Sequence, residues 1–184
     1  MNCEHAADGI TDSTVSRRRT PPASAFLGDL GGFYYWDSYE APLRRGDLAM
    51  HEIYLALFAH HPRWARRLLI LRGWIVAPFG LKATTAADLD AIEIKPAYAV
   101  GEKIARFTLY GQSDSEIVTG GDDRHLDFRV SVRKLTERGA SRVVLSTVVS
   151  PHNFFGKAYL FAILPFHRLG VRTILSNAVK AGRL

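Results

Sequence analysis

Apolar and polar residues alternate with a period of two in several parts of the chain, and this period is typical of strands. The first predicted strand is the aromatic segment 33–41, in which Tyr35, Asp37 and Tyr39 share one face. Gly120–Asp122 is predicted to be a turn between two later strands. The later segments with this alternation are 105–110, 115–119, 124–134 and 142–149. Because their connections are short, we predict an antiparallel meander.

Three segments follow the helical period instead. Apolar residues recur at i, i+3, i+4 and i+7 within 48–61, and Trp64, Leu68, Leu71 and Ile75 recur at helical spacing within 62–76, with Pro62 between the two predicted helices. This arrangement predicts an αα-hairpin. A long final helix is predicted over 154–179, with Asn153 as its N-cap.

The order of these elements indicates the fold class. A strand, an αα-hairpin, a run of antiparallel strands and a long helix predict an α+β protein whose curved antiparallel sheet wraps around the C-terminal helix, the helix-grip arrangement. Residues 33–184 are expected to form this single domain, and 1–32, rich in Ser, Thr, Gly and Asp, a disordered N-terminal tail. We expect a ligand cavity between helix and sheet.

Composition narrows the functional classes. The 184 residues are 47% hydrophobic and 23% charged, as in ordinary globular proteins. The single cysteine, Cys3, excludes an intrachain disulfide and favours the cytoplasm. We expect no secretory signal and no membrane span, because the longest apolar run, 159–166, is far shorter than a bilayer-crossing helix. The sequence also lacks GxGxxG, P-loop and HExxH motifs, so no cofactor is expected. A homodimer is compatible with the sequence.

The net charge of +6 is unevenly placed. No acidic residue follows Glu137, whereas Arg168 and Arg172 lie one helical turn apart in the acid-free C-terminal segment. A second acid-free segment covers the predicted helix at 62–76. These basic faces indicate either an anionic partner, such as lipid headgroups or an acidic ligand, or a solubilising surface. Because no nucleic-acid-binding motif is present, we expect no nucleic acid partner.

Several longer stretches carry a family resemblance. They are DSYEAPL at 37–43, FGLKA at 79–83, GGDDRHLDFRVSV at 120–132 and LSTVVSPHNFFGKAYLFAILPFHRLGVR at 145–172. These stretches resemble the bacterial DUF2867 family of unknown function, and the element order resembles the Bet v 1/START-like (SRPBCC) helix-grip superfamily. The resemblance covers residues 33–184. It implies the fold and an apolar-ligand cavity, and it implies no reaction.

One group of residues has the composition of a metal site. Asp123, His125 and Asp127 would lie on one face of a strand, where two carboxylates and an imidazole can hold a divalent ion. The alternative is a solvated outer strand face, which continues with Arg129. We expect the solvated face and therefore no metal.

Other side chains are candidates for catalysis or binding. His152, His167 and Tyr110 are candidates for acid–base catalysis, and the alternative for the two histidines is a structural role beside or within the final helix. Aromatic residues are candidates to line the cavity, and their alternative is core packing. These aromatic candidates are Tyr35, Trp74, Phe107, Phe128, Tyr159 and Phe166.

These observations lead to one leading hypothesis and two alternatives. The leading hypothesis is a cytoplasmic protein that binds a small apolar or amphipathic molecule between the C-terminal helix and the sheet. The first alternative is an enzyme of cyclase, dehydratase or hydrolase type on the same scaffold. The second is an accessory module that binds an anionic partner through its basic helix faces.

Overall fold

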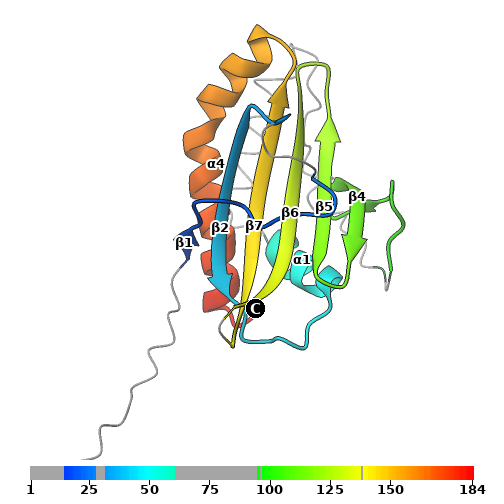
Figure 1. Cartoon of the computed structure of the whole chain (residues 1–184), viewed down its shortest axis with the longest axis vertical. Coiled ribbons are helices and arrows are strands. Elements are labelled where there is room, and N and C mark those ends of the chain that lie inside the picture. The colour runs from blue at the N-terminus through cyan, green and yellow to red at the C-terminus, as the bar shows by residue number, and fades with distance from the viewer. Residues whose placement is uncertain (1–14, 28–31, 61–94, 96, 138) are drawn as a thin grey trace, which may run out of the picture.

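The fold combines a curved antiparallel sheet with a long C-terminal helix, and it confirms the predicted α+β class. The computed structural model describes residues 15–27, 32–60, 95, 97–137 and 139–184 (Figure 1). The elements are β1 (Ser16–Arg17), β2 (Tyr35–Pro42), α1 (Met50–Phe58), β3 (Lys103–Ile104), β4 (Phe107–Ser113), β5 (Glu116–Asp122), β6 (Leu126–Glu137), β7 (Ala140–Pro151) and α4 (Phe154–Lys180). The predicted second helix, at 62–76, lies outside the described residues.

The seven strands form one sheet in the order β1-β2-β7-β6-β5-β4-β3, in which every pair is antiparallel. Strands β4 to β7 follow one another as the predicted meander, and β2 pairs with β7 along its whole length. The predicted turn at Gly120–Asp122 is wrong, because β5 continues to Asp122. Gly120 is required inside this strand, since a Cβ there would overlap the carbonyl oxygen of Phe128 on β6.

Both described helices pack on the same side of the sheet, which we call the helix face. Tyr35, Asp37 and Tyr39 of β2 point to this side, because alternate residues of a strand share a face. Helix α4 lies along β2 and β7, and α1 lies against β5 and β6 (Figure 1). Within the described ranges, neither helix has the length and apolar character needed to cross a bilayer.

The opposite side of the sheet, the outer face, is crossed by residues 15–27 (Figure 1). Strand β1 pairs with β2, and Arg18 forms ion pairs with Glu40 at 2.9 Å and with Glu137 at 2.7 Å. Leu27 is buried against Val118 and Val148 of the sheet. Residues 15–27, which lie before the expected domain start at residue 33, therefore pack on the sheet. A two-residue strand is too short to leave a periodic pattern in the sequence.

Candidate functional site

The helix face has two halves that differ in packing. In the packed half, Ile53 of α1, Leu145 of β7 and Leu175 of α4 are at most 1% exposed. In the aromatic half, the Phe107 and Phe128 side chains are only half-buried. The Phe107 and Phe128 rings meet edge to face with 5.5 Å between their centroids. The aromatic half is therefore the part of the helix face where apolar side chains keep accessible surface.

A buried carboxylate lies beside this aromatic half. Asp37 is 1% exposed, and its Oδ2 accepts a hydrogen bond from the Tyr35 hydroxyl at 2.7 Å. Its Oδ1 lies 3.2 Å from Nε2 of His167 on α4, whose side chain is 24% exposed. A charged group is rarely buried without such partners, because the loss of hydration must be offset by hydrogen bonds. Tyr35, Asp37 and His167 thus form one cluster between β2 and α4.

Strand geometry and helix anchoring bring the cluster together. Tyr35 and Asp37 are two residues apart on β2, so both side chains point toward α4. The start of α4 is fixed by Asn153, whose Oδ1 accepts from the Gly156 N–H at 2.9 Å, which confirms the predicted N-cap. A Cβ at Gly156 would overlap the carbonyl oxygen of His125, so α4 begins directly against the β5–β6 connection.

Tyr35 links the cluster to a cation. Burial, opposed in part by the hydrogen bond from Arg168, raises the pKa of Tyr35 to about 12. Nε of Arg168 lies 3.5 Å from the Tyr35 hydroxyl oxygen, so a row of hydrogen bonds leads from the guanidinium through the phenol to Asp37. The phenol therefore stays protonated at neutral pH and donates its hydrogen to the carboxylate.

A further buried hydroxyl lies next to this cluster. Thr147 on β7 is the register partner of Asp37 and is 4% exposed. Register partners of an antiparallel pair share a face, so Thr147 also points toward the helices. Its Oγ1 has no hydrogen-bond partner within the described part of the chain. A buried polar atom of this kind is an unused hydrogen-bonding position beside the carboxylate.

The pairing of His167 with Asp37 is suited to proton transfer. A carboxylate behind an imidazole fixes the orientation of the ring, and the contact provides a hydrogen-bonded path between the two groups. In the described ranges only one ring nitrogen of His167 has a partner, namely the Nε2 that faces Asp37. Because the side chain is 24% exposed, the ring is accessible to a small molecule. The arrangement can bind a polar group or exchange a proton with it.

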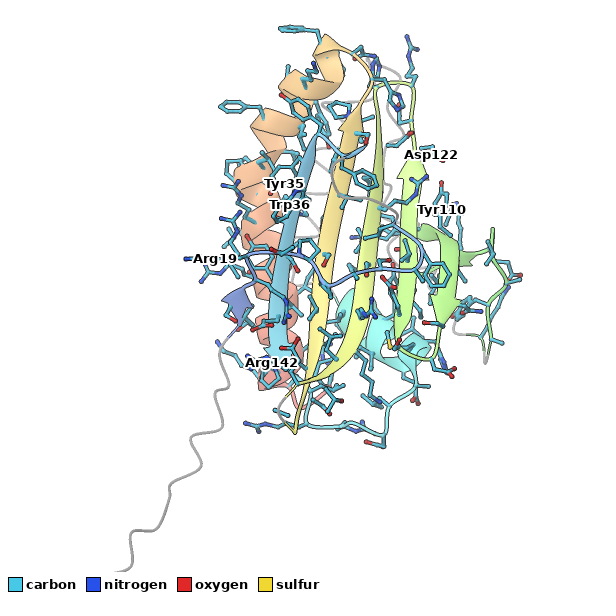
Figure 2. The ribbon with its side chains drawn as sticks, in the orientation of Figure 1. Arg19, Tyr35, Trp36, Tyr110, Asp122 and Arg142 are labelled. Carbon is cyan, nitrogen blue, oxygen red and sulfur yellow. The ribbon has the colours of Figure 1, made fainter. Side chains whose placement is uncertain are left out.

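The other two catalytic candidates lie elsewhere in the molecule. Nε2 of His152 is 3.0 Å from Asp127 Oδ2, and both side chains are more than one-third exposed. Tyr110 lies on the outer face, where its hydroxyl donates to Asp122 at 2.6 Å and the guanidinium of Arg129 lies 3.6 Å from its ring centroid (Figure 2). Neither residue contacts the cluster around Asp37.

The metal candidates do not share a strand face. Strand β6 begins at Leu126, so Asp123 and His125 belong to the β5–β6 connection, where the alternation rule does not apply. His125 instead contacts Asn153 and packs on the Phe155 ring at 4.7 Å. Among the described residues, no group of three His, Cys, Asp or Glu side chains is arranged to hold an ion.

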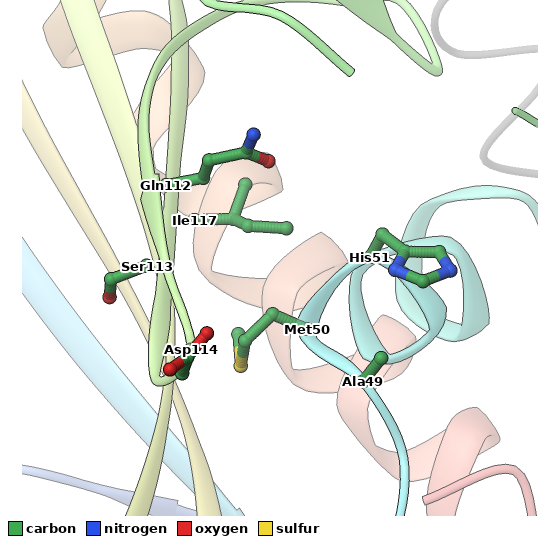
Figure 3. Close-up of a pocket in the computed structure, with 7 residues that line it drawn as sticks. All are labelled: Ala49, Met50, His51, Gln112, Ser113, Asp114 and Ile117. Atoms are coloured by element: carbon green, nitrogen blue, oxygen red, sulfur yellow. The ribbon is translucent and has the colours of Figure 1, made fainter. Parts of the chain in front are cut away.

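A pocket of about 460 Å³ lies at the far end of the packed half, between the first turn of α1 and the β4–β5 hairpin (Figure 3). His51, Gln112 and Asp114 supply polar atoms, and Met50 and Ile117 supply apolar surface. Among the aromatic candidates that the structure describes, none lines this pocket. It is therefore a separate feature from the aromatic half.

The aromatic candidates are found in different environments. Tyr35, Phe107 and Phe128 lie on the helix face, and Tyr159 packs with Tyr35 around Leu160. Phe166 is 54% exposed. Trp74 lies outside the described residues.

Sequence reasoning identified Tyr35 and His167 but not Asp37, which joins them. The sequence did contain a signal for Asp37: it is an acidic residue on the same strand face as Tyr35 and Tyr39, a face that the alternation predicts to be buried.

Comparison with known proteins gives one result. Residues 30–174 match the family model described as "Protein of unknown function (DUF2867)". No curated protein and no solved structure matches the chain.

Proposed function

Because the chain belongs to the DUF2867 family, whose members have no assigned function, we propose a function from its geometry: it binds a small amphipathic molecule against the aromatic half of the helix face. The observation that carries the proposal is that an apolar and a polar group of side chains are neighbours on one face, because Phe128 and Tyr35 are both register partners of Val149 and Tyr35 donates to Asp37. Half-buried aromatic rings lie beside a buried Asp37–His167 pair. We also include in the proposal that the chain belongs to the helix-grip superfamily, as the order of its elements suggests.

The apolar part of the ligand would lie on the aromatic side chains. Phe107 packs edge to face between Phe58, at 6.1 Å, and Phe128, at 5.5 Å, so the three rings form a continuous apolar surface. Phe58 is buried beneath this surface, and a ligand that covers the accessible parts of Phe107 and Phe128 removes apolar area from water. Ligand sites in proteins are commonly apolar surfaces with a few polar groups that orient the bound molecule.

The polar part of the ligand would face the cluster. The His167 ring supplies a hydrogen-bonding nitrogen, and the Thr147 hydroxyl is a second group without a partner in the described ranges. Asp37 fixes the imidazole, and each of its two oxygens already has one partner, Tyr35 or His167. A hydroxyl, carbonyl or carboxyl head on an apolar body therefore fits both parts of the site.

Two measurements test the proposal. Native mass spectrometry of freshly purified protein should show a retained small molecule. Titration with anilinonaphthalene sulfonate, an apolar probe with an anionic head, should give saturable fluorescence, and Phe128→Ala should weaken its affinity about tenfold because one aromatic contact is lost. The matched control is Phe154→Ala, which removes a ring that is 85% exposed on α4. Circular dichroism checks that both variants fold.

The proposal fails if the probe binds Phe128→Ala as tightly as it binds the wild type. It also fails if Phe154→Ala weakens the probe as much as Phe128→Ala does, because the binding surface would then be the exposed side of α4. The milder Phe128→Leu keeps a large apolar side chain and should give an intermediate affinity. This variant separates a loss of ligand contact from a loss of folding.

The Asp37–His167 pair supports a second candidate function, acid–base catalysis on the bound molecule. Binding and catalysis make different predictions for His167→Gln, which keeps a hydrogen-bonding side chain and removes the titratable ring. An enzyme would retain substrate in this variant and product or nothing in the wild type, so the retained masses would differ. A binding protein would retain the same mass in both proteins, with only the occupancy changed.

A further inference from the structure

The outward side of α4 is aromatic and basic at once. Among the described residues, seven large hydrophobic side chains are exposed, and four of them belong to this one helix, so the apolar surface is concentrated there. Phe154 is 85% exposed and Phe161 is 79% exposed. Concentrated apolar surface on a protein exterior indicates a site of interaction. Figure 2 shows side chains of α4 projecting away from the sheet.

Two of these side chains, Phe154 and Phe161, form a stripe along the helix with Arg172. Phe154 and Phe161 are seven residues apart, which is about two turns, and Arg172 is about five turns after Phe154. All three therefore project from nearly the same side of α4, over about 27 Å. Lys157 flanks the stripe, and its Nζ lies 5.3 Å from the ring centroid of Tyr34, which is 63% exposed. We call this set the outward stripe.

Charge decides which partner fits the outward stripe. Helix α4 contains Lys157, Arg168, Arg172 and Lys180, and no Asp or Glu occurs between Phe154 and Lys180. Two copies of the chain that met through this stripe would bring like charges together, which is unfavourable. The partner must therefore be anionic and must also accept protruding aromatic rings.

We propose that the outward stripe docks the protein on an anionic lipid surface. In this arrangement, the Phe154 and Phe161 rings enter the boundary between headgroups and acyl chains, and Lys157 and Arg172 contact the anionic headgroups. A bilayer interface supplies apolar and anionic layers side by side, and it needs no preformed pocket for the rings. The inference is independent of the proposed ligand site, because the stripe and the aromatic half lie on opposite sides of α4.

Vesicle sedimentation tests the inference. The full chain is mixed with vesicles of phosphatidylcholine alone or of phosphatidylcholine with phosphatidylglycerol, at low and at higher salt. We expect binding only to the vesicles with phosphatidylglycerol, and weaker binding as salt screens the charges. Lys157→Glu with Arg172→Glu should lower the partition coefficient at least about tenfold, given the contribution of each cation near an anionic surface. Phe154→Ser with Phe161→Ser should lower it by a similar factor.

Matched controls come from exposed residues away from α4. Lys103→Glu changes a charge on β3, which forms the sheet edge opposite to β1. Val100→Ser removes an apolar side chain that is 65% exposed. Both controls should bind as the wild type does. In Phe161→Trp, the introduced indole should shift its emission to the blue on vesicles and be quenched by brominated lipid.

Several results would overturn the inference. They are no binding of the wild type to the anionic vesicles at low salt, equal binding to both vesicle types, and an unquenched indole on bound protein. Binding that is unaffected by both double variants would also assign the contact to another surface. Binding to soluble polyglutamate without any binding to vesicles would assign the stripe to an acidic protein partner and refute the lipid proposal.

Discussion

The two halves of the helix face are built from the same sheet but differ in what fills them. In the packed half, α1 and the C-terminal part of α4 bury Ile53 and Leu175 completely. In the aromatic half, Phe107 and Phe128 keep accessible surface. This half also borders a buried acidic side chain, Asp37, whereas the side chains named for the packed half are apolar. The first half has the features of a stability core, and the second has those of a binding surface.

Under the proposed function, this difference separates a half that stabilises the fold from a half that binds a ligand. Each fully buried aliphatic side chain in the packed half contributes about 1.5–3 kcal/mol, because its surface is removed from water. The aromatic half gives up part of this contribution and accepts the cost of a buried carboxylate. Functional surfaces commonly carry such a cost, which the rest of the fold offsets. The comparison leads to four predictions.

The largest effect is expected in the packed half. Leu175→Ala should lower the free energy of unfolding by about 2–5 kcal/mol, because the side chain is fully buried and leaves a cavity. Leu164→Ala, on the same helix but beside the aromatic half, should cost about half as much because its side chain is only partly buried. Urea denaturation measures both. Equal losses would remove the distinction between the two halves.

The contact between Asp37 and His167 tests the aromatic half. His167→Ala leaves the Asp37 carboxylate with Tyr35 as its remaining partner, and it should cost about 1.5–3 kcal/mol. Asp37→Asn removes the charge and keeps the shape, so the double variant should cost less than the sum of the two single variants. A double-mutant cycle by chemical denaturation gives the coupling. Strict additivity would contradict a direct interaction.

The anchor of α4 tests how its position is fixed. Gly156→Ala should lower stability by about 1–3 kcal/mol, because the added Cβ overlaps the carbonyl oxygen of His125. Gly170→Ala is the matched control, since a Cβ at this helical position meets no atom. It should be neutral or slightly stabilising, as alanine favours helix. Thermal melts of the two variants compare the effects, and a neutral Gly156→Ala would show that the start of α4 can shift.

The smallest effect concerns pH. Folding raises the pKa of Tyr35 from its ordinary value of 10.0 to about 12, chiefly through burial. The folded state therefore holds this proton more tightly, and the resulting stability is complete below pH 10 and is lost as the pH rises toward about 12. The loss should be about 1 kcal/mol, since solvent screens the half-buried ring. Tyr35→Phe should lose less stability than the wild type between pH 9 and pH 11; parallel curves would refute the assignment.

Much of the fold could be predicted from local pattern. The alternation along β6 and β7, the amphipathic α1 and the Asn153 cap of α4 are all visible in the sequence, because each depends on residues within a few positions. The alternation failed where the backbone departs from a regular strand. In β4 the register of pairing with β5 shifts between Leu109 and Gly111, which interrupts the alternation. The strand continues past this irregularity to Ser113, beyond its predicted end at residue 110.

The features that the sequence did not predict depend on contacts between residues that are far apart in the chain. The outer-face position of residues 15–27 depends on the ion pairs of Arg18 with Glu40 and Glu137, the second of which is 119 residues away. The room that Gly111 leaves for the Phe26 ring is equally invisible in the sequence. No local period records these contacts, because each exists only once the sheet has formed.

The sequence by itself determined the element types, the antiparallel meander, the long basic helix and the two members of the site that it identified, Tyr35 and His167. Only the tertiary structure decided that these residues meet. Asp37 and His167 are 130 positions apart and approach because β2 pairs with β7 and α4 packs along both strands. Periodicity reports which way a side chain faces, whereas a site requires packing to bring faces together.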